Sequence, residues 1–472
     1  MATFTVTTAS DVVNAGDGVL SLREAVQQAN ATAAADTILF ANALEGQTLT
    51  LTQGQITISS NMSIDGDKDD SGSRIEVNAS GVVWAFATTG VGAVANLFDL
   101  DINGGNALEG DGGGILVGND TSAVITGCTI TGIGDPEQEP GEIANGIFAG
   151  SSSTVKILDS EISGTNGSGI WASSANISVQ DSVITDNHAL RGGGVNLFGG
   201  EARFENCVIS NNGWNEQLPF YDESRGGGLY ISYCNTSVVR TTISNNNAGY
   251  GGGGIFAKDS TVSLENSTIA DNHAGASESR GGAIAFSSAY DHSGRLSITS
   301  STITGNSIDP VEDLGNRGGA IYTAHLLTLS NSIVTGNFSG AYSSDIAGEI
   351  TSSNGHNIFG SYVAGAQWSD LQNWSPTALF ASIDPETGGG ALALNGGPTP
   401  TVALRDALDN PALSGALVLT SGELDQRGIA RPQPGESLPD IGAFELTQSA
   451  LSTVPTDNND VLTGTSAADL LD

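Results

Sequence analysis

Arginines precede a repeated glycine pair in the middle of the chain. Only 15 of the 472 residues are Lys or Arg, yet four of five successive Gly-Gly steps follow an arginine. These residues are Arg191, Arg225, Arg280 and Arg317, with Tyr250 in the remaining segment. A guanidinium group donates paired hydrogen bonds to carboxylates and sulfates, so the row predicts a site for a linear anionic polymer. Alternatively, each arginine pairs with a nearby acid such as Glu223, Glu278 or Asp313.

A second row of residues follows the arginines and Tyr250 by five or six positions in the sequence. Its members are Phe148, Trp171, Asn196, Tyr230, Phe256, Ala285 and Tyr322. Each follows an aliphatic residue, and because strand side chains alternate, the row is expected to point outward. Aromatic rings beside arginines stack against the apolar faces of sugar rings. The alternative is that inserted loops, the longest of which carries Tyr221, cover these rings and form a satellite core.

Proton-transfer groups lie near both rows. Uronate chemistry removes the proton at C5, which needs a base and a group that neutralises the carboxylate. The expected catalytic residues are Tyr230, His188, Asn196 and Arg225. The expected substrate-binding residues are Arg191, Arg280, Arg317, Trp171, Tyr221, Tyr250, Phe256 and Tyr322. His188 and His273 share one position, and a single histidine there is more typical of a turn than of a catalyst.

These groups fit several reactions. Expulsion of the 4-oxygen after proton removal would make the protein a polysaccharide lyase, which we expect, whereas reprotonation would make it a C5-epimerase. A glycoside hydrolase needs a carboxylate pair. Residues that keep this alternative open are Asp186, Asp271, Asp222 and Glu223. A non-catalytic adhesin or matrix protein with the same polysaccharide-binding surface is the remaining alternative.

A repeated three-residue phrase shows which elements position the candidate site residues. It consists of Cys, Ser or Thr, then any residue, then Ile or Val, as in Cys128-Thr-Ile130 and Ser160-Glu-Ile162. The phrase ends at Ile130, Ile162, Ile184, Ile209, Ile243, Ile269, Ile303 and Val334, at intervals of 22 to 34 residues. A shortest interval of 22 residues, with the other intervals longer by variable amounts, predicts three-sided coils that carry insertions of different lengths. We therefore predict an all-β fold, a right-handed parallel β-helix over residues 101–375, preceded by first coils within residues 1–100.

The turns of the predicted coils carry small polar residues. An asparagine usually follows the phrase: Asn187, Asn212, Asn246, Asn272, Asn306 and Asn337. Stacked coils would bring these side chains into a ladder at about 4.8 Å spacing. Cys128 and Cys207 share a register with serines and a threonine, so we predict that they lie in the interior rather than at a catalytic site.

Both ends of the solenoid need caps. Ser21-Leu-Arg-Glu24 is a capping-box pattern that predicts a helix from Ser21 to about Ala33, which we place over the N-terminal end. Ser21 to Ala25 with Ala35 to Phe40 resembles the CSLREA-type opening of bacterial β-helix proteins. Residues 394–399 and 425–445 resemble the closing segment of choice-of-anchor Q proteins, which we place at 376–447. These resemblances imply the same fold and export to the cell surface or medium.

The last segment, residues 448–472, is a linker followed by a short acidic motif. Asp460 and Asp469 are nine residues apart, which resembles the start of an RTX nonapeptide array and implies calcium bound by these residues. Glycine-rich repeats should follow such a motif, so we expect a longer native protein. Residues 1–17 lack the features of a signal peptide, and together with the motif and the acidic net charge this favours type I secretion. A solvated acidic tail is the alternative.

The net charge of −37 excludes whole classes of partner. Nucleic acids and anionic lipid surfaces bind basic patches, so neither is expected as a partner. No apolar run is long enough to span a membrane. We expect a secreted monomer whose partner is an acidic polysaccharide.

Overall fold

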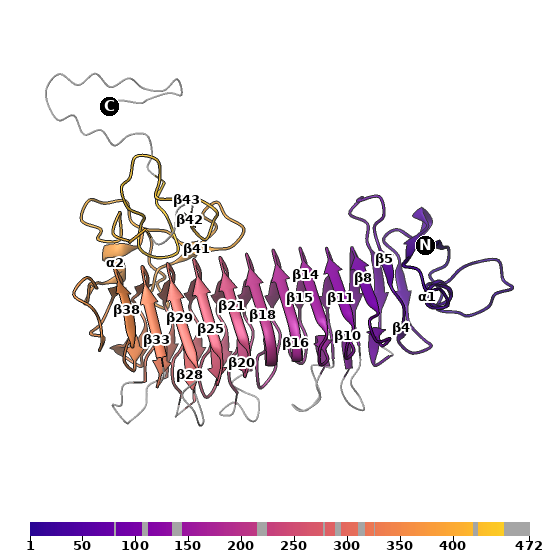
Figure 1. Ribbon diagram of the computed structural model, residues 1–472, viewed down its shortest axis with the longest axis horizontal. Coiled ribbons are helices and arrows are strands. Elements are labelled where there is room, and N and C mark those ends of the chain that lie inside the picture. The colour runs from indigo at the N-terminus through magenta and orange to yellow at the C-terminus, as the bar shows by residue number, and fades with distance from the viewer. Residues whose placement is uncertain are drawn as a thin grey trace, which may run out of the picture.

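The computed structural model describes residues 1–79, 82–105, 112–134, 144–214, 224–276, 279–287, 294–309, 317–324, 326–418 and 423–447. In these ranges the chain winds into a right-handed parallel β-helix, whose coils stack along one axis (Figure 1). Each central coil gives one strand to each of three faces, and equivalent strands of neighbouring coils pair in parallel. The predicted fold class is confirmed.

Face 1 carries both predicted rows, and face 2 follows it around the coil. Face 1 consists of β4 (Ile56–Ile58), β7 (Trp84–Thr88), β10 (Gly112–Val117), β13 (Ala144–Ala149), β16 (Ile170–Gln180), β18 (Val195–Glu205), β20 (Leu229–Ser232), β24 (Ile255–Lys258), β28 (Ile284–Ser287), β32 (Ile321–Thr323) and β37 (Ile346–Ala347). Face 2 consists of β1 (Thr3–Val6), β2 (Asp36–Phe40), β5 (Met62–Asp65), β8 (Val94–Phe98), β11 (Ser122–Thr126), β14 (Thr154–Leu158), β21 (Asn235–Val239), β25 (Thr261–Glu265), β29 (Arg295–Thr299), β33 (Leu326–Ser330) and β38 (Ser352–Gly355), with β16 and β18 continuing into it.

Face 3 closes the coil, and a short fourth row follows it. Face 3 consists of β3 (Thr48–Thr50), β6 (Ile75–Asn78), β9 (Leu100–Asn103), β12 (Thr129–Thr131), β15 (Glu161–Ser163), β17 (Val183–Thr185), β19 (Val208–Ser210), β22 (Thr242–Ser244), β26 (Thr268–Ala270), β30 (Thr302–Thr304), β34 (Ile333–Val334) and β39 (Ile358–Phe359). The fourth row consists of β23 (Asn247–Ala248), β27 (His273–Ala274), β31 (Ser307–Ile308), β35 (Phe338–Ser339) and the antiparallel β36 (Tyr342–Ser343).

The aliphatic residues of the repeated phrase form one column through the core, as predicted. Ile130 pairs with Ile162, Ile243 with Ile269, and Ile303 with Val334 on neighbouring strands of face 3, and none of these side chains is more than 1% exposed. Burying such a side chain stabilises the fold by about 1.5–3 kcal/mol. Each coil packs these apolar side chains against the equivalent side chains of the coils before and after it. The column therefore fixes the register in which the outward-facing rows are stacked.

The predicted asparagine ladder runs through the turn after face 3. Each asparagine is at most 1% exposed, and its Nδ2 donates to Oδ1 of the next asparagine at 2.9–3.1 Å. The ladder also extends beyond the asparagines, because Thr165 donates to Asn187 and Asn337 donates to Asp345. Burial raises the pKa of Asp345 to about 6, although hydrogen bonds from Asn337 and Ser361 lower it.

The cysteines are interior residues, as predicted for Cys128 and Cys207. Their backbone N–H groups donate to Ser160 Oγ at 3.1 Å and to Thr241 Oγ1 at 3.2 Å, within a ladder of small side chains. Both are buried, and burial raises the pKa of each thiol to about 12. A protonated thiol is a poor nucleophile, so neither cysteine belongs to a reactive site.

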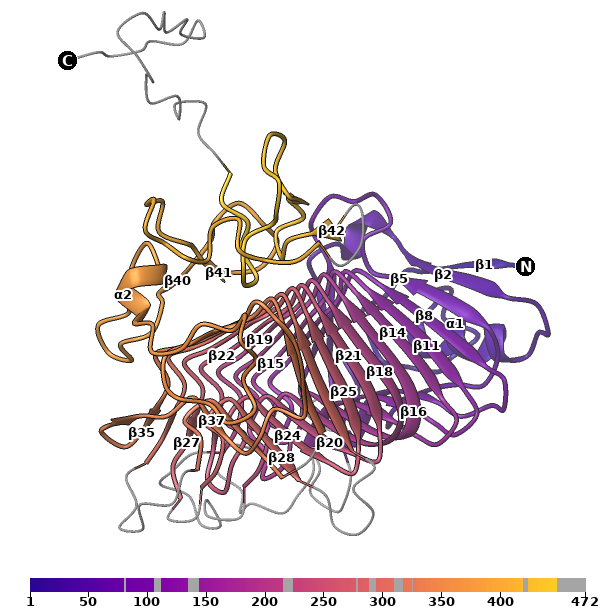
Figure 2. The same cartoon turned by 60° about the vertical axis from the view of Figure 1, so that its left-hand side comes forward.

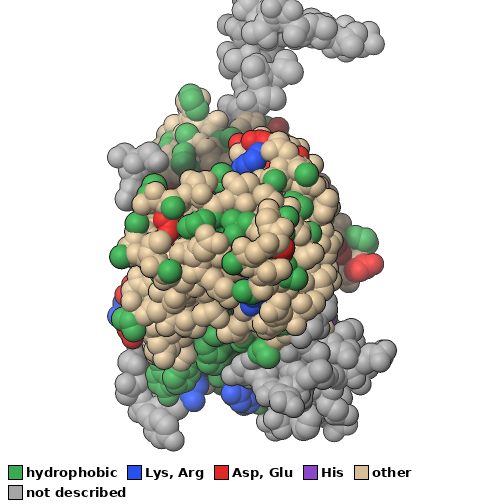
Figure 3. Space-filling view, turned by 90° about the vertical axis from the view of Figure 1, so that its right-hand side faces the viewer, with side chains coloured by type: hydrophobic (Ala, Val, Ile, Leu, Met, Phe, Trp, Pro, Cys, Tyr) green, Lys and Arg blue, Asp and Glu red, His purple; other side chains and the backbone are tan. Residues whose placement is uncertain are grey.

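A short helix, α1 (Leu22–Asn30), caps the N-terminal end. Ser21 Oγ accepts from the Glu24 N–H at 3.2 Å, and Glu24 accepts from the Ser21 N–H at 3.0 Å, which is the predicted capping box. The helix ends before the predicted Ala33 because the Asn30 side chain turns to the first coil, where it bonds Thr57 and Ser59. Figure 3 shows this end of the molecule, where apolar side chains are exposed only in scattered groups. A 3₁₀ turn, η1 (Asn42–Leu44), follows β2.

The segment after the last coil lies along the outside of face 3 (Figure 2). Its elements are α2 (Pro376–Leu379), β40 (Leu392–Ala393), β41 (Thr401–Val402), β42 (Glu423–Leu424) and β43 (Ala430–Arg431). Thr242, Thr268 and Thr302 bond Pro400, Gln426 and the Ala443 N–H at 2.5–3.0 Å. These threonines are buried, whereas Glu161 and Val183 are exposed in the same register of earlier coils.

A buried ion pair and a hydrogen bond from the same arginine hold this closing segment on the solenoid. Arg431 Nε lies 3.2 Å from Glu445 Oε2, and Arg431 Nη1 donates to Asn266 of the solenoid at 3.0 Å. Burial raises the pKa of Glu445 to about 7 and that of Asp440 to about 6. Both carboxyls therefore bind protons more tightly in the folded protein than in the unfolded chain.

The stability of the closing segment is expected to fall as the pH rises from 4.5 to about 7. A group whose folded pKa is raised contributes its full stability below its unfolded pKa and loses it as the pH passes its folded pKa. The measurement is the unfolding temperature across this window. Glu445→Gln removes one titrating group and should flatten the profile. An unfolding temperature that rises through the window in the unmodified chain would contradict the assignment.

Candidate functional site

We use the term strip for the two predicted rows together, which lie on the outer side of face 1 and on the segments that lead into it. The aromatic row has the predicted register: Phe148 pairs with Trp171, Asn196 with Tyr230, and so on along the row. The whole register is Leu116, Phe148, Trp171, Asn196, Tyr230, Phe256, Ala285, Tyr322 and Ala347. The strip therefore runs along the solenoid axis, one residue per coil.

The arginine row differs from the prediction at one coil. Arg191 bridges to Arg225, Arg225 to Gly251, and Gly251 to Arg280, so these residues occupy equivalent positions. Gly251, not Tyr250, stands in the row, and Tyr250 precedes it by one residue. A Cβ atom at position 251 would lie 2.5 Å from the Arg280 carbonyl oxygen, which explains why the aromatic side chain is displaced from this position.

Each of three arginines lies over an aromatic ring of the next coil. The Cζ atom lies 5.8 Å from the ring centroid for Arg191 over Tyr230, 4.4 Å for Arg225 over Tyr250, and 4.8 Å for Arg280 over Tyr322. Arg280 Nη1 also donates to Tyr322 Oη at 2.8 Å. Contacts of this kind contribute about 0.5–2 kcal/mol each and fix the guanidinium planes on the strip. Neither Arg191 nor Arg280 forms an ion pair with a residue that the structure describes.

The rings of the strip also stack on one another. Phe148 and Trp171 have centroids 4.6 Å apart, and Tyr230 and Phe256 lie parallel with centroids 5.5 Å apart. Phe256 is buried at 6% exposed, whereas the other three are half-buried. Stacking restricts ring motion, so a ligand that contacts the half-buried rings meets a preorganised surface.

The structure brings some of the predicted catalytic residues together. Asn196 and Tyr230 are direct neighbours on β18 and β20, and Arg191 lies over the Tyr230 ring. Arg225 lies over the rings of Tyr250 and Phe256 instead, so it faces the part of the strip one coil further along from Tyr230. An amide, a phenol and a guanidinium group thus face one area, which is the donor set that uronate chemistry needs.

The predicted histidine lies apart from this group. His188 is exposed at the start of the connection that follows the asparagine ladder, and its backbone N–H donates to Thr165. Its ring makes no hydrogen bond with any residue in the described ranges, Asn196 and Tyr230 included. His273 occupies the equivalent position three coils later, where Nδ1 lies 2.9 Å from Ser307 Oγ. Tyr230, and not His188, thus lies beside Asn196 and Arg191, and the choice of proton-transfer group stays a prediction.

Several predicted residues fall outside the part of the chain that the structure describes. These are Tyr221, Asp222, Glu223, Glu278, Asp313, Asp460 and Asp469. Arg317 is half-buried at the start of its coil, next to β32. Two hypotheses therefore stay predictions. One is that the arginines pair with Glu223, Glu278 and Asp313, and the other is that Asp460 and Asp469 bind calcium.

Of the carboxylates considered for hydrolysis, Asp186 and Asp271 lie in the described ranges and do not form a pair, whereas Asp222 and Glu223 lie outside those ranges. Asp186 and Asp271 hold the same position in their coils but are three coils apart, which is about 14 Å at the usual strand spacing. Glycosidase carboxyl pairs are at most about 10 Å apart. Burial raises the pKa of Asp271 to about 6, and its side chain faces Thr387 and Asp384 of the closing segment rather than the strip.

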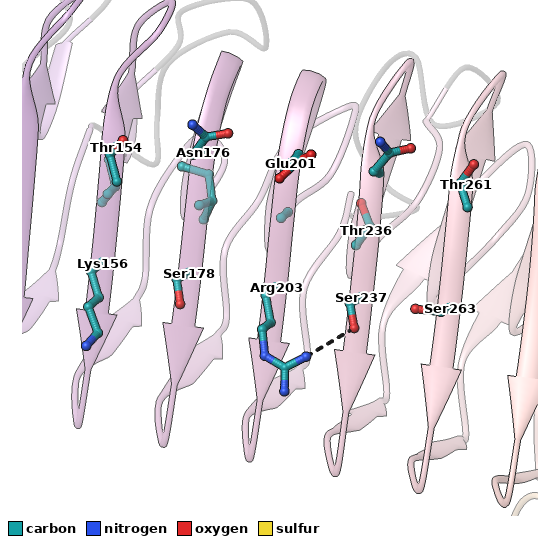
Figure 4. A pocket seen from close by; sticks show the side chains of 14 residues that line it. Thr154, Lys156, Asn176, Ser178, Glu201, Arg203, Thr236, Ser237, Thr261 and Ser263 are labelled. Carbon is teal, nitrogen blue, oxygen red and sulfur yellow. Dashed lines mark hydrogen bonds between the residues drawn. The ribbon is translucent and has the colours of Figure 1, made fainter.

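Sequence reasoning missed a groove on face 2, which Figure 4 shows. The groove has a volume of about 550 Å³ and lies across β14, β16, β18, β21 and β25. Its outward side chains are Thr154, Lys156, Asn176, Ser178, Glu201, Arg203, Asn235, Ser237, Thr261 and Ser263. The signal that reveals them is the period of two in the strand before each repeated phrase, where short polar residues alternate with buried aliphatic ones.

One group of carboxylates in the described ranges has the spacing of a metal site. Ligand atoms of Glu436, Asp440 and Glu445 lie within 4.8 Å of one another. Asp440 already accepts from the Ser414 and Leu446 N–H groups, and Glu445 already accepts from Arg431. These contacts hold the closing segment together, so the cluster has a structural explanation without a cation.

A comparison with protein-family models agrees with the fold. A family model described as the right handed β-helix region matches residues 71–216 and 190–359. No curated protein matches the chain. The solved structure of pectate lyase Pel9A is similar at 13% sequence identity and a TM-score of 0.47, covering 95% of this chain and 97% of that one. No helix in the described ranges has the length and apolar character needed to cross a membrane.

Proposed function

We infer the function from the premise that this chain belongs to the right-handed β-helix family, and we propose that it is an extracellular polysaccharide lyase. The strip binds an acidic, uronate-containing polysaccharide, and the area around Tyr230 cleaves it by β-elimination. The observation that carries the proposal is the placement of Arg191, Arg225 and Arg280 over aromatic rings of the neighbouring coils. Fixed guanidinium groups beside half-buried rings suit a polymer of carboxylated sugars.

The proposed reaction begins at C5 of a uronate bound over Asn196 and Tyr230. Arg191 and Asn196 donate to the sugar carboxylate, which stabilises the negative charge that develops when the C5 proton leaves. Tyr230 reacts as its phenolate, whose oxygen accepts this proton. The electron pair then forms the C4–C5 double bond, the bond from C4 to its oxygen breaks, and the leaving oxygen takes the proton from the Tyr230 hydroxyl, which restores the phenolate. The products are an unsaturated uronate end and a new reducing end.

The test is an incubation of the protein, with calcium, with alginate, pectate, hyaluronan, chondroitin and glucuronan. We expect the ultraviolet absorbance of an unsaturated uronate to rise on one polymer, together with new reducing ends. Reducing ends without absorbance would identify a hydrolase. Inverted C5 centres in the product NMR spectrum would identify an epimerase. Binding with no change in the polymer would identify an adhesin, and each of these outcomes overturns the lyase proposal.

We also propose that Asp460 and Asp469 bind calcium in the secreted protein, on the basis of their resemblance to an RTX array. A cation that binds only the folded state raises the unfolding temperature by linkage. Calorimetric titration of the full chain with calcium should give a binding heat that Asp460→Asn with Asp469→Asn removes. Retention of the same heat by the double variant would place the calcium elsewhere.

A further inference from the structure

One strand connects the strip to the groove on face 2. β18 spans Val195–Glu205 and continues from face 1 into face 2. Its outward residues are, in order, Asn196 of the strip, Phe198, and then Glu201 and Arg203 of the groove. Within each half of β18, neighbouring outward residues are about 7 Å apart. Between Phe198 and Glu201 the chain turns through Gly199 and Gly200, whose φ angles are 71° and 84°, so the path from strip to groove bends at the corner between the faces.

An exposed aromatic pair stands at the corner between the two faces. We call Phe198 and Tyr233 the corner pair; their side chains are 50% and 54% exposed, and their centroids are 5.7 Å apart at 73°. The aromatic rings of the strip are, by contrast, half-buried or buried. Exposed rings held edge to face offer one open ring surface, which suits stacking against the apolar face of a sugar.

The groove beyond the corner has the composition of a glycan site. Hydroxyl and amide groups line it on five neighbouring strands, and these groups exchange hydrogen bonds readily with sugar hydroxyls. Lys156 and Arg203 lie in one register, separated by Ser178 (Figure 4). Arg203 pairs with Glu205 and donates to Ser237 at 3.4 Å, yet 48% of its side chain stays exposed to a ligand.

The basic residues are enriched in the part of the chain that forms the strip and the groove. Nine of the 15 basic residues, but only 17 of the 52 acids, fall between residues 144 and 334. This stretch is therefore much less acidic than the rest of the chain, with a formal net charge of −8 against −29. Since it still carries more acids than bases, an anionic occupant has to pair with individual basic groups of the two surfaces, such as Arg191, Lys156 and Arg203.

We propose that the groove is a second binding site for the acidic polysaccharide, reached from the strip over the corner pair. The inference rests on the proposed function and adds the path of the substrate. The polymer crosses the solenoid along β18, from Asn196 past Phe198 to Arg203, instead of staying on face 1. Only oligosaccharides long enough to pass the corner then use the groove.

Calorimetric titration of the full chain with short and long oligosaccharides of the bound polysaccharide tests this path. Tyr233→Ala and Arg203→Ala should each lower the affinity for long oligosaccharides by up to about tenfold and leave the affinity for short ones unchanged. Arg191→Ala should weaken both lengths because it acts on the strip. Tyr342→Ala is the matched control, since it removes an aromatic side chain that is even more exposed than Tyr233, at 68% against 54%, and that lies on β36 outside both faces. Unchanged unfolding temperatures verify that the exposed substitutions preserve the fold.

The outcomes separate the two proposals. If the unmodified protein binds the polysaccharide but both groove variants bind long oligosaccharides as tightly as it does, the crossing path is wrong and the function on the strip stands. If the unmodified protein binds none of the acidic polysaccharides, the proposed function fails, and the second site fails with it.

Discussion

Replacing Tyr230 by phenylalanine is expected to lower kcat on the cleaved polysaccharide by at least about a hundredfold, the usual contribution of a general base. The substitution keeps the ring that stacks on Phe256 and lies beneath Arg191, and it removes only the oxygen that takes the proton. KM should change little because the binding surface is preserved. Steady-state kinetics by ultraviolet absorbance gives both constants.

The matched control is Tyr342→Phe, which removes a phenolic oxygen from a residue that is 68% exposed and outside the strip. Its kinetics should equal those of the unmodified protein. Arg225→Ala should instead raise KM, since Arg225 lies one position along the strip from Tyr230. If Tyr230→Phe keeps its full rate, another group is the base, and the exposed His188 becomes the residue to replace next.

Replacing Asn272 by alanine is expected to reduce the free energy of unfolding by about 3–5 kcal/mol, because it leaves several buried polar groups without partners. Asn272 Nδ2 donates to the carbonyls of Ile243 and Ala270 and to Asn306 Oδ1, and its own Oδ1 accepts from Asn246. The loss should exceed that of an ordinary surface substitution several times over. Urea unfolding, followed by circular dichroism, measures it.

Asn235→Ala is the control for this experiment, because Asn235 is an exposed asparagine on β21. We expect a change below about 0.5 kcal/mol there. Equal losses for the two variants would show that the ladder contributes no more than a surface amide. Asn272→Asp should be at least as damaging as the alanine variant, since it places a carboxylate in a buried position and removes the donor.

Much of the solenoid was predictable because contacts between coils repeat the order of the sequence. In a stack of parallel coils, each residue meets its equivalents in the coils before and after it. The isoleucine column, the asparagine ladder, the buried Cys128 and the aromatic row therefore followed from counting positions. Helix α1 followed from the capping box, which is a local interaction.

The arginine row shows what the spacing of residues in the sequence could not predict. Its register was right at four coils, but Gly251 replaced Tyr250 because a Cβ atom would meet the Arg280 carbonyl there. The placement of each guanidinium over a ring of the next coil depends on side-chain rotamers, which no spacing encodes. The separation of His188 from Asn196 and Tyr230 has the same origin, since the turn fixes its backbone but not a partner for its ring.

By itself the sequence determined the coil, its ladders and the residues that face outward on each strand, because nearest-neighbour stacking converts periodicity directly into register. Only the tertiary structure decided which outward surfaces stay open. The closing segment returns over face 3 and buries Thr242, Thr268 and Thr302, through contacts between residues more than a hundred positions apart. The strip and the groove stay uncovered by that segment and are joined along β18, and pairing at such distances leaves no periodic trace in the sequence.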